Sequence, residues 1–109
     1  MKRLTIKEIL DNYTKYIHQD ICIQGWVRAF RSNRFIALSD GSTANNIQIV
    51  VDFEKFDEEI IKKIHTASSL KVTGEIVESQ GAGQNIEVLA KKIEILGDNL
   101  TDELEKTVL

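Results

Sequence analysis

The chain has 109 residues, of which 42% are hydrophobic and 28% charged, a composition that suits one domain with a single core that needs no metal or disulfide. No apolar run approaches the roughly 20 residues of a membrane helix, and Lys7 and Glu8 interrupt the N-terminus where a signal peptide would be apolar. Cys22 is the only cysteine, so it has no partner for a disulfide within the chain. We therefore expect a reduced, cytoplasmic protein without membrane contact. The net charge of -3 argues mildly against a nucleic-acid partner, because the neutralisation of phosphates normally uses an excess of Lys and Arg.

The first predicted element is a short N-terminal helix. Thr5-Ile6-Lys7-Glu8 has the form of a capping box, in which the threonine caps the helix and the glutamate reaches back to it. The helix is expected to run to about Asp11. Tyr13 and Tyr16 then fall in the loop before the first strand, where we interpret them as packing or rim residues.

Residues 21–30 alternate in polarity with a period of two, which indicates a strand. Gly25 in its middle allows a bend or the close approach of another backbone. Trp26 follows it, and closure of the core is the favoured role for its ring, with a second aromatic surface as the alternative. The two faces of the strand hold Ile21, Ile23, Val27 and Ala29 on one side, and Gln24, Trp26 and Arg28 on the other.

A local basic strip lies within this acidic chain. Between residues 21 and 39 there are three arginines, Arg28, Arg31 and Arg34, and no acid, whereas the acids gather at 54–59 and 98–105. A focused binding face needs such a distribution. On charge alone, three arginines that merely solvate a strand and its turn remain an equal alternative.

The middle of the chain predicts two more strands and a helix. Arg31-Ser32-Asn33-Arg34 is a turn-like break before a second strand at 35–39, which ends at the turn Asp40-Gly41-Ser42. A third strand runs from Ile47 to about Asp52. Residues 57–67 are predicted to be helical because acids occupy the first turn and an apolar stripe has helical spacing: Phe56, Ile60, Ile61 and Ile64.

The last third of the chain predicts a hairpin of two strands. A fourth strand alternates from Leu70 to Ile76, and the connection 79–84 contains Gly81-Ala82-Gly83. The fifth strand begins at Asn85 and reaches Leu96. Its apolar residues change from even to odd positions, which predicts a bulge near residues 90–92.

This order of elements predicts an all-β domain with short helices. A five-stranded Greek-key barrel with a helix between strands three and four is the OB-fold, here with an added N-terminal helix. In that fold the second and third strands, and the loops joining strands one to two and four to five, bind oligonucleotides. The basic strip falls on the first of those loops, so fold and charge indicate the same face.

Two side chains on the predicted binding face suit an unpaired base. If Ile36 and Leu38 point inward, Phe35 is partly wet and can stack on a base; core burial, the usual place of a phenylalanine, is the alternative. Gln48 points away from its apolar neighbours on the third strand, and its carboxamide can donate to and accept from a base edge. A merely solvated glutamine is the competing interpretation.

Charged residues complete the candidate set. Arg31 and Arg34 flank the first loop, where a guanidinium can contact a phosphate or stack on a base. Arg28 can serve the same purpose or pair with a neighbouring carboxylate. Glu87 points outward from the fifth strand and could accept from a base or hold an arginine. The glycines at 81–83 open no helix, the histidines are isolated, and we predict no catalytic, cofactor-binding or metal site in this chain.

Several segments match one known family in their order and spacing over some seventy residues. They are Gly25-Trp26-Val27-Arg28 with Arg31, Phe35-Ile36-Ala37-Leu38, Ile47-Gln48-Ile49-Val50, Val72-Thr73-Gly74, and Ile86-Glu87-Val88 with Ala90 and Ile93. With these segments the chain resembles the anticodon-binding domain of class II aspartyl- and asparaginyl-tRNA synthetases. The turn Asp40-Gly41-Ser42 and the short connection 79–84 resemble the asparaginyl branch.

The resemblance implies a role for each matching residue. Phe35 would stack on the central anticodon base, a uridine, with Gln48 and Arg31 near it, and Glu87 would lie near the third anticodon base. Adding the two loops, the predicted nucleic-acid-binding residues are Arg28, Arg31, Asn33, Arg34, Phe35, Gln48, Gln84 and Glu87.

The resemblance also implies a longer parent protein. We expect residues 1–97 to be the anticodon-binding domain and 98–109 to begin a hinge towards a catalytic domain that this chain lacks. The parent would attach asparagine to tRNA with ATP and Mg²⁺ and form a homodimer through that catalytic domain, whereas the chain itself would bind tRNA without turnover.

Three alternatives remain open at this stage. The domain could belong to the aspartyl branch. It could be a free-standing single-strand-binding OB protein, although that predicts more than 6% aromatic residues and a basic overall charge. It could also be a purely structural or protein-binding barrel with the arginines as solvated surface.

Overall fold

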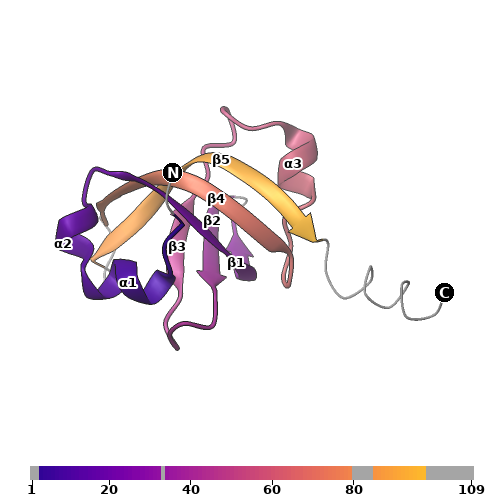
Figure 1. Cartoon of the computed structure of the whole chain (residues 1–109). Helices are drawn as coiled ribbons and strands as arrows, with labels where there is room; N and C mark the ends of the chain where they lie inside the picture. The colour runs from indigo at the N-terminus through magenta and orange to yellow at the C-terminus, as the bar shows by residue number, and fades with distance from the viewer. Residues whose placement is uncertain (1–2, 33, 80–84, 98–109) are drawn as a thin grey trace.

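The segments with alternating polarity form strands, and these strands close into a barrel. The structure, a computed structural model, describes residues 3–32, 34–79 and 85–97. Within these ranges the five strands are hydrogen-bonded in the ring order β1-β2-β3-β5-β4 (Figure 1). In chain order the elements are α1 (Ile6–Asp11), α2 (Tyr13–Tyr16), β1 (Asp20–Arg31), β2 (Phe35–Ser39), β3 (Ile47–Val50), α3 (Glu58–Lys62), β4 (Ser69–Glu78) and β5 (Ile86–Gly97).

The barrel is closed by one short parallel pair. β1 pairs antiparallel with β2 and β4, β2 with β3, and β4 with β5. β3 and β5 run parallel, with Ile49 opposite Val88 and Val50 opposite Leu89. The predicted mostly-β architecture, with five strands and short helices, is confirmed. The Greek-key detail stays a prediction.

Burial follows the predicted alternation. Ile36 and Leu38 are fully buried in β2, and the even positions of β4 from Leu70 to Ile76 are buried while the odd ones are half-buried. Each fully buried aliphatic side chain of this size contributes roughly 1.5–3 kcal/mol relative to an exposed one. The core therefore holds one face of each strand in place, and its opposite face is left outside.

Two irregularities predicted in the strands are present. A Cβ at Gly25 would collide with the carbonyl oxygen of Ser39 on β2, so this position needs glycine for the close approach of the two backbones. In β5 the register changes between Ala90, opposite Gly74, and Lys92, opposite Thr73. Lys91 is the extra residue of this bulge, and its Nζ lies 2.8 Å from Oδ1 of Asp20.

The N-terminal helix covers one end of the barrel (Figure 1) and is capped as predicted. The hydroxyl oxygen of Thr5 accepts from the backbone N–H of Glu8 at 3.1 Å. The turn after β2 is fastened to the same helix, because Oδ2 of Asp40 accepts from the N–H of Ile6 at 2.9 Å. Oδ1 of Asp40 accepts from the N–H of Ser42, also at 2.9 Å. One carboxylate thus joins α1 to the β2–β3 connection.

Four local predictions are corrected. Trp26 is 37% exposed and outside the core; its ring lies against Gly41 of the β2–β3 connection.

Tyr13 and Tyr16 lie in helix α2, not in a loop, and pack against the core. The helix predicted at 57–67 is limited to Glu58–Lys62. Ala67 has φ of +75°, which a helix does not allow. The third strand ends at Val50 and not near Asp52.

Candidate nucleic-acid interface

The outer face of β2 and β3 carries the side chains that the sequence singled out. Phe35 pairs with Arg31 on β1 and with Val50 on β3, and Val50 pairs with Leu89 on β5. These four residues form one row across four strands. Because successive residues of a strand alternate faces, Phe35 points away from the side that Ile36 and Leu38 occupy. The phenyl ring is half-buried, not sealed in the core.

An arginine lies beside that ring. The guanidinium carbon of Arg34 is 5.7 Å from the centroid of the Phe35 ring, within the range of a cation–π contact. The backbone holds this arginine at the end of β3: its N–H donates to the carbonyl of Arg31 at 3.0 Å, and its own carbonyl accepts from Val51 at 2.7 Å. The β1–β2 turn therefore presents Arg31 and Arg34 at the edge of the aromatic surface.

A hollow of about 190 Å³ lies next to Phe35 on this face. Ala29 and Ala37 supply small side chains at its floor, which leaves room beside the ring. Three of the predicted residues line this hollow, Arg31, Phe35 and Gln48, together with Ala29, Ala37, Asn46 and Ile47. We call it the Phe35 hollow. It offers a ring for stacking, a carboxamide for a base edge and a cation for a phosphate.

Gln48 and Glu87 are brought together by the pairing of β3 with β5. The Nε2 of Gln48 donates to Oε2 of Glu87 at 2.9 Å. A carboxylate only accepts, so it selects the amide nitrogen and leaves the carbonyl oxygen of Gln48 free to accept from another group. The pair is half-exposed, and a base reaching Gln48 would therefore meet a carboxamide of defined orientation.

The three arginines of the basic strip are exposed. None of them pairs with a carboxylate within the described part of the chain, so an ion pair does not account for Arg28 there. Arg28 sits where the register of β1 against β2 shifts, and it does not line the Phe35 hollow. Asn33 and Gln84, the two remaining predicted residues, lie outside the residues that the structure describes.

Two residues of this face escaped the sequence reasoning. Leu89 is 39% exposed and continues the row of Phe35 and Val50. Its odd position before the β5 bulge was a signal that it faces outward. Asn46 lines the Phe35 hollow from the connection before β3, and no periodic pattern marks a residue in such a connection.

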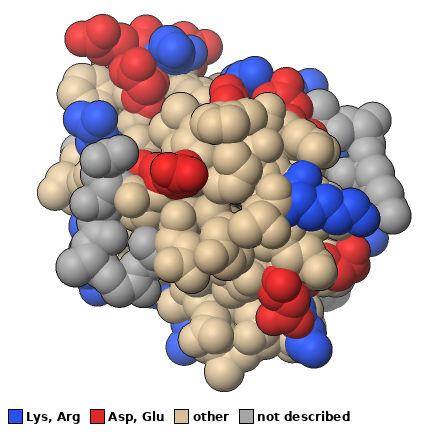
Figure 2. All heavy atoms as spheres, turned by 90° about the vertical axis from the view of Figure 1, so that its left-hand side faces the viewer, with Lys and Arg blue, Asp and Glu red and all other residues tan. Residues whose placement is uncertain are grey.

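The face that carries α1 and α2 is largely uncharged at its centre. Figure 2 shows this face, with Lys, Arg, Asp and Glu mostly towards its edges and uncharged side chains between them. In the described ranges no helix is long and apolar enough to cross a membrane. The same residues contain no group of three or more His, Cys, Asp or Glu side chains that could hold a metal ion.

Comparison with known proteins gives the same fold and a consistent set of relatives. Residues 21–96 match the family model of the OB-fold nucleic acid binding domain, the tRNA anti-codon family. An asparagine–tRNA ligase of Cytophaga hutchinsonii is 48% identical over 100 residues, which cover 89% of this chain and 22% of that protein. An asparagine–tRNA ligase of Porphyromonas gingivalis is 47% identical over 111 residues, which cover 97% of this chain and 23% of that protein.

The chain spans about a fifth of the length of these curated relatives. Among solved structures, the asparaginyl-tRNA synthetase of Pyrococcus horikoshii complexed with asparaginyl-adenylate superposes with a TM-score of 0.72. The sequence identity is 21%, and the match covers 89% of this chain and 23% of that one. At this identity the superposition supports the fold alone.

Proposed function

This chain belongs to the family of OB-fold nucleic acid binding domains, and on that premise we propose that it binds the anticodon loop of a tRNA as the N-terminal domain of an asparagine–tRNA ligase. The observation that carries the proposal is the position of Phe35. Its half-buried ring lies on the outer face of the barrel, beside a hollow that Arg31 and Gln48 also line. A loosened base can lie flat there, with polar groups at its edge.

Each predicted residue has a part in this proposal. The central anticodon base stacks on Phe35, a contact worth about 1–3 kcal/mol, and Gln48 reads its edge. Glu87 orients that carboxamide and faces the neighbouring base. Arg28, Arg31 and Arg34 contact phosphates or stack on bases, and Asn33 and Gln84 act from the two loops. Together they select a loop by its bases and hold it by its backbone.

The parent ligase is part of the same proposal. Residues 1–97 form the anticodon domain, and 98–109 begin the hinge to a catalytic domain. In the full-length enzyme, a cytoplasmic homodimer, ATP and Mg²⁺ activate asparagine. We assign ATP and Mg²⁺ to the catalytic domain of that ligase.

The relatives support the asparaginyl branch over the alternatives. Several asparagine–tRNA ligases are 42–54% identical to this chain. A free-standing single-strand-binding protein would be expected to bind by charge, and the net charge here is -3. Selection by base identity, not by charge, is therefore the property to test.

The decisive experiment titrates the chain with RNA stem-loops that differ only at the three anticodon bases. We expect the tightest binding to the asparagine anticodon and the largest loss when the central base changes. Equal binding to all loops would favour a single-strand-binding protein that ignores sequence. No binding to any loop at low salt would refute the proposal, because low salt strengthens every phosphate contact.

A further inference from the structure

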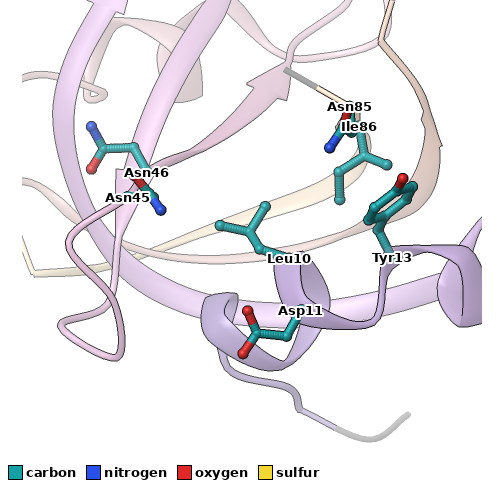
Figure 3. Close-up of a pocket in the computed structure, with 7 residues that line it drawn as sticks. All are labelled: Leu10, Asp11, Tyr13, Asn45, Asn46, Asn85 and Ile86. Carbon is teal, nitrogen blue, oxygen red and sulfur yellow. The ribbon is translucent and has the colours of Figure 1, made fainter. Parts of the chain in front are cut away.

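Two further hollows lie at the two ends of helix α1. One, of about 500 Å³, lies near its C-terminal end, where Leu10 faces the β2–β3 connection and the start of β5 (Figure 3). It shares Asn46 with the Phe35 hollow and therefore adjoins the proposed interface. The other, of about 470 Å³, lies near the N-cap Thr5 and is lined in part by Trp26. We call this one the Trp26 hollow.

Trp26 presents an apolar surface that the barrel leaves partly uncovered. Its ring is 37% exposed on the outer face of β1, although tryptophan is highly buried on average. Gly41 contacts the six-membered part of the ring. Arg3 and Gln24 line the same hollow, and Nη1 of Arg3 donates to Oε1 of Gln24. The hollow thus combines an aromatic surface with a positive charge.

The chain leaves the barrel next to this hollow. Trp26 of β1 pairs with Ser69 of β4, and Ser69 pairs with Gly97, the last residue of β5. A Cβ at Gly97 would lie 3.9 Å from the Cβ of Ser69, so the row faces one side of the sheet. Neighbouring strands are about 4.8 Å apart, which places Gly97 about 10 Å from Trp26. An extended chain covers that distance in about three residues, so Leu100 can reach the ring.

Residues 98–109 follow Gly97 directly and lie outside the described residues. Leu100, Leu104 and Val108 recur in this segment at intervals of four, a spacing typical of one helical face. The segment is also acidic, with Lys106 as its one basic residue against four acids: Asp98, Asp102, Glu103 and Glu105. It therefore carries the apolar side chains and the negative charge that the Trp26 hollow suits.

The charges around the Trp26 hollow favour an acidic partner. Arg3 makes no ion pair within the described part of the chain. Lys71 lies opposite Gln24, and its Nζ is 3.9 Å from Oε2 of Glu94, a distance at which an ion pair is weak. The carboxylate of Asp40, which also lines the hollow, already accepts three hydrogen bonds from α1 and the β2–β3 connection. Arg3 and Lys71 are therefore the charges left to meet a partner, and both are positive.

We propose that residues 98–109 dock on the Trp26 hollow, with Leu100 and Leu104 against the indole ring and the acids towards Arg3. The contact fixes the direction in which the chain leaves the barrel. In the proposed ligase this direction determines how the anticodon domain is held relative to the catalytic domain, a consequence that rests on the proposed function. The docking itself needs no RNA.

Trp26 is the only tryptophan of the chain, so its fluorescence reports the contact directly. Without RNA, the double variant Leu100→Ala with Leu104→Ala should shift the emission to longer wavelength and increase quenching by acrylamide, because water replaces the leucines at the indole. The matched control is Thr101→Ala with Thr107→Ala, which changes the same segment and keeps its leucines. Its emission and quenching should equal those of the original chain.

Trp26→Ala tests the same contact from the side of the barrel. Docking protects the bond after Lys106 from trypsin, and cleavage follows the population of the undocked segment. Trp26→Ala should release the peptide that begins at Thr107 about tenfold faster, the factor for one apolar side chain that loses its burial. Phe53→Ala, which removes a ring that is 55% exposed and outside the Trp26 hollow, should leave the rate unchanged.

The outcomes separate this inference from the proposed function. If the leucine variant has the emission and quenching of the original chain, or a folded Trp26→Ala is cleaved no faster, residues 98–109 do not cover Trp26 and the inference is overturned. A shift of the emission that requires an anticodon stem-loop also overturns it, because Trp26 then faces RNA. The leucine variant changes only residues after the last strand, so it tests the contact even if Trp26→Ala does not fold. Binding at Phe35 is tested by the stem-loop titration and stands or fails without this contact.

Discussion

Gln48 and Glu87 are hydrogen-bonded across β3 and β5 although 39 residues separate them in the chain, with Nε2 of Gln48 2.9 Å from Oε2 of Glu87. The carboxylate accepts only, and so it holds the amide group of Gln48 in one of its two orientations. The free carbonyl oxygen of Gln48 then favours a base with a donor N–H, and not an acceptor, at the ring nitrogen that it faces. Uracil offers one at N3, whereas cytosine has an acceptor there.

The first prediction concerns this orientation. Glu87→Gln replaces the carboxylate by a group that can also donate, so Gln48 is no longer held in one orientation. The preference for uracil over cytosine at the central anticodon position should fall about tenfold, the value of one well-placed hydrogen bond. Fluorescence titration with the two stem-loops measures this ratio.

A matched control for Glu87→Gln is Glu58→Gln, which removes an exposed carboxylate in α3 and should leave the ratio unaltered. If Glu87→Gln weakens binding to both loops equally, Glu87 contacts the RNA without orienting Gln48.

The second prediction concerns stacking on Phe35. Phe35→Ala should lower the affinity for the asparagine anticodon stem-loop by about 1–3 kcal/mol and leave the fold intact, since the ring is only half-buried. Phe53→Ala is the control, because that ring is 55% exposed and lies outside the Phe35 hollow. Equal affinities of a folded Phe35→Ala and the original chain would remove Phe35 from the site.

The third prediction concerns a phosphate contact by Arg31. If its guanidinium neutralises one phosphate, Arg31→Ala should reduce the slope of log K against log salt concentration by about 0.7, the value for single strands. Titrations at several salt concentrations measure the slope. Arg3 is an exposed arginine that does not line the Phe35 hollow, so Arg3→Ala should not change the slope. The same slope in both variants would argue against a phosphate contact.

The fourth prediction concerns stability and pH at Asp40. Burial raises the pKa of its carboxyl, but hydrogen bonds from the Ser42 hydroxyl and from the N–H groups of Ile6 and Ser42 outweigh this and lower the pKa below its usual range. A lowered folded-state pKa means that the ionised carboxylate stabilises the fold above the unfolded pKa of about 3.9, and that this stability is lost as pH falls through the folded value.

Asp40→Asn should therefore destabilise the chain at pH 7 by about 1.5–3 kcal/mol, the range of hydrogen bonds to a charged group. The difference between the variant and the original chain should begin to shrink below about pH 4, where the unfolded chain binds a proton at this carboxyl, and should continue to shrink as pH falls through the lowered pKa of the folded chain. Urea unfolding across this pH range provides the measurement. A difference that is constant with pH would mean that the shape of the side chain matters and its charge does not.

Much of the fold was predictable from local patterns. The alternation at 35–39 placed Ile36 and Leu38 in the core and Phe35 outside it, and the change of phase in the fifth strand predicted the bulge at Lys91. Thr5 was recognised as a helix cap. These features depend on the pleat of a single strand or on one turn of chain, which the nearest residues determine.

The candidate site was predictable only in part. Phe35, Gln48 and Arg31 were identified, and the structure places all three around one hollow. Asn46 was missed because an asparagine in a connection carries no mark of its surroundings. Leu89 was missed although its odd position before the bulge indicated the outward face. Trp26 was assigned to the core by its residue type, whereas its strand position, shared with Gln24 and Arg28, was the better guide to its exposure.

The sequence by itself determined which side chains of each strand face inward, where the strands bend and which arginines gather without acids. Only the tertiary structure decided which outward side chains become neighbours, such as Gln48 with Glu87 across β3 and β5, and Asn46 with Arg31 around one hollow. The reason is physical. Facing direction follows from backbone geometry within a few residues, whereas adjacency on the surface depends on the closure of the barrel and the register of strands far apart in the chain.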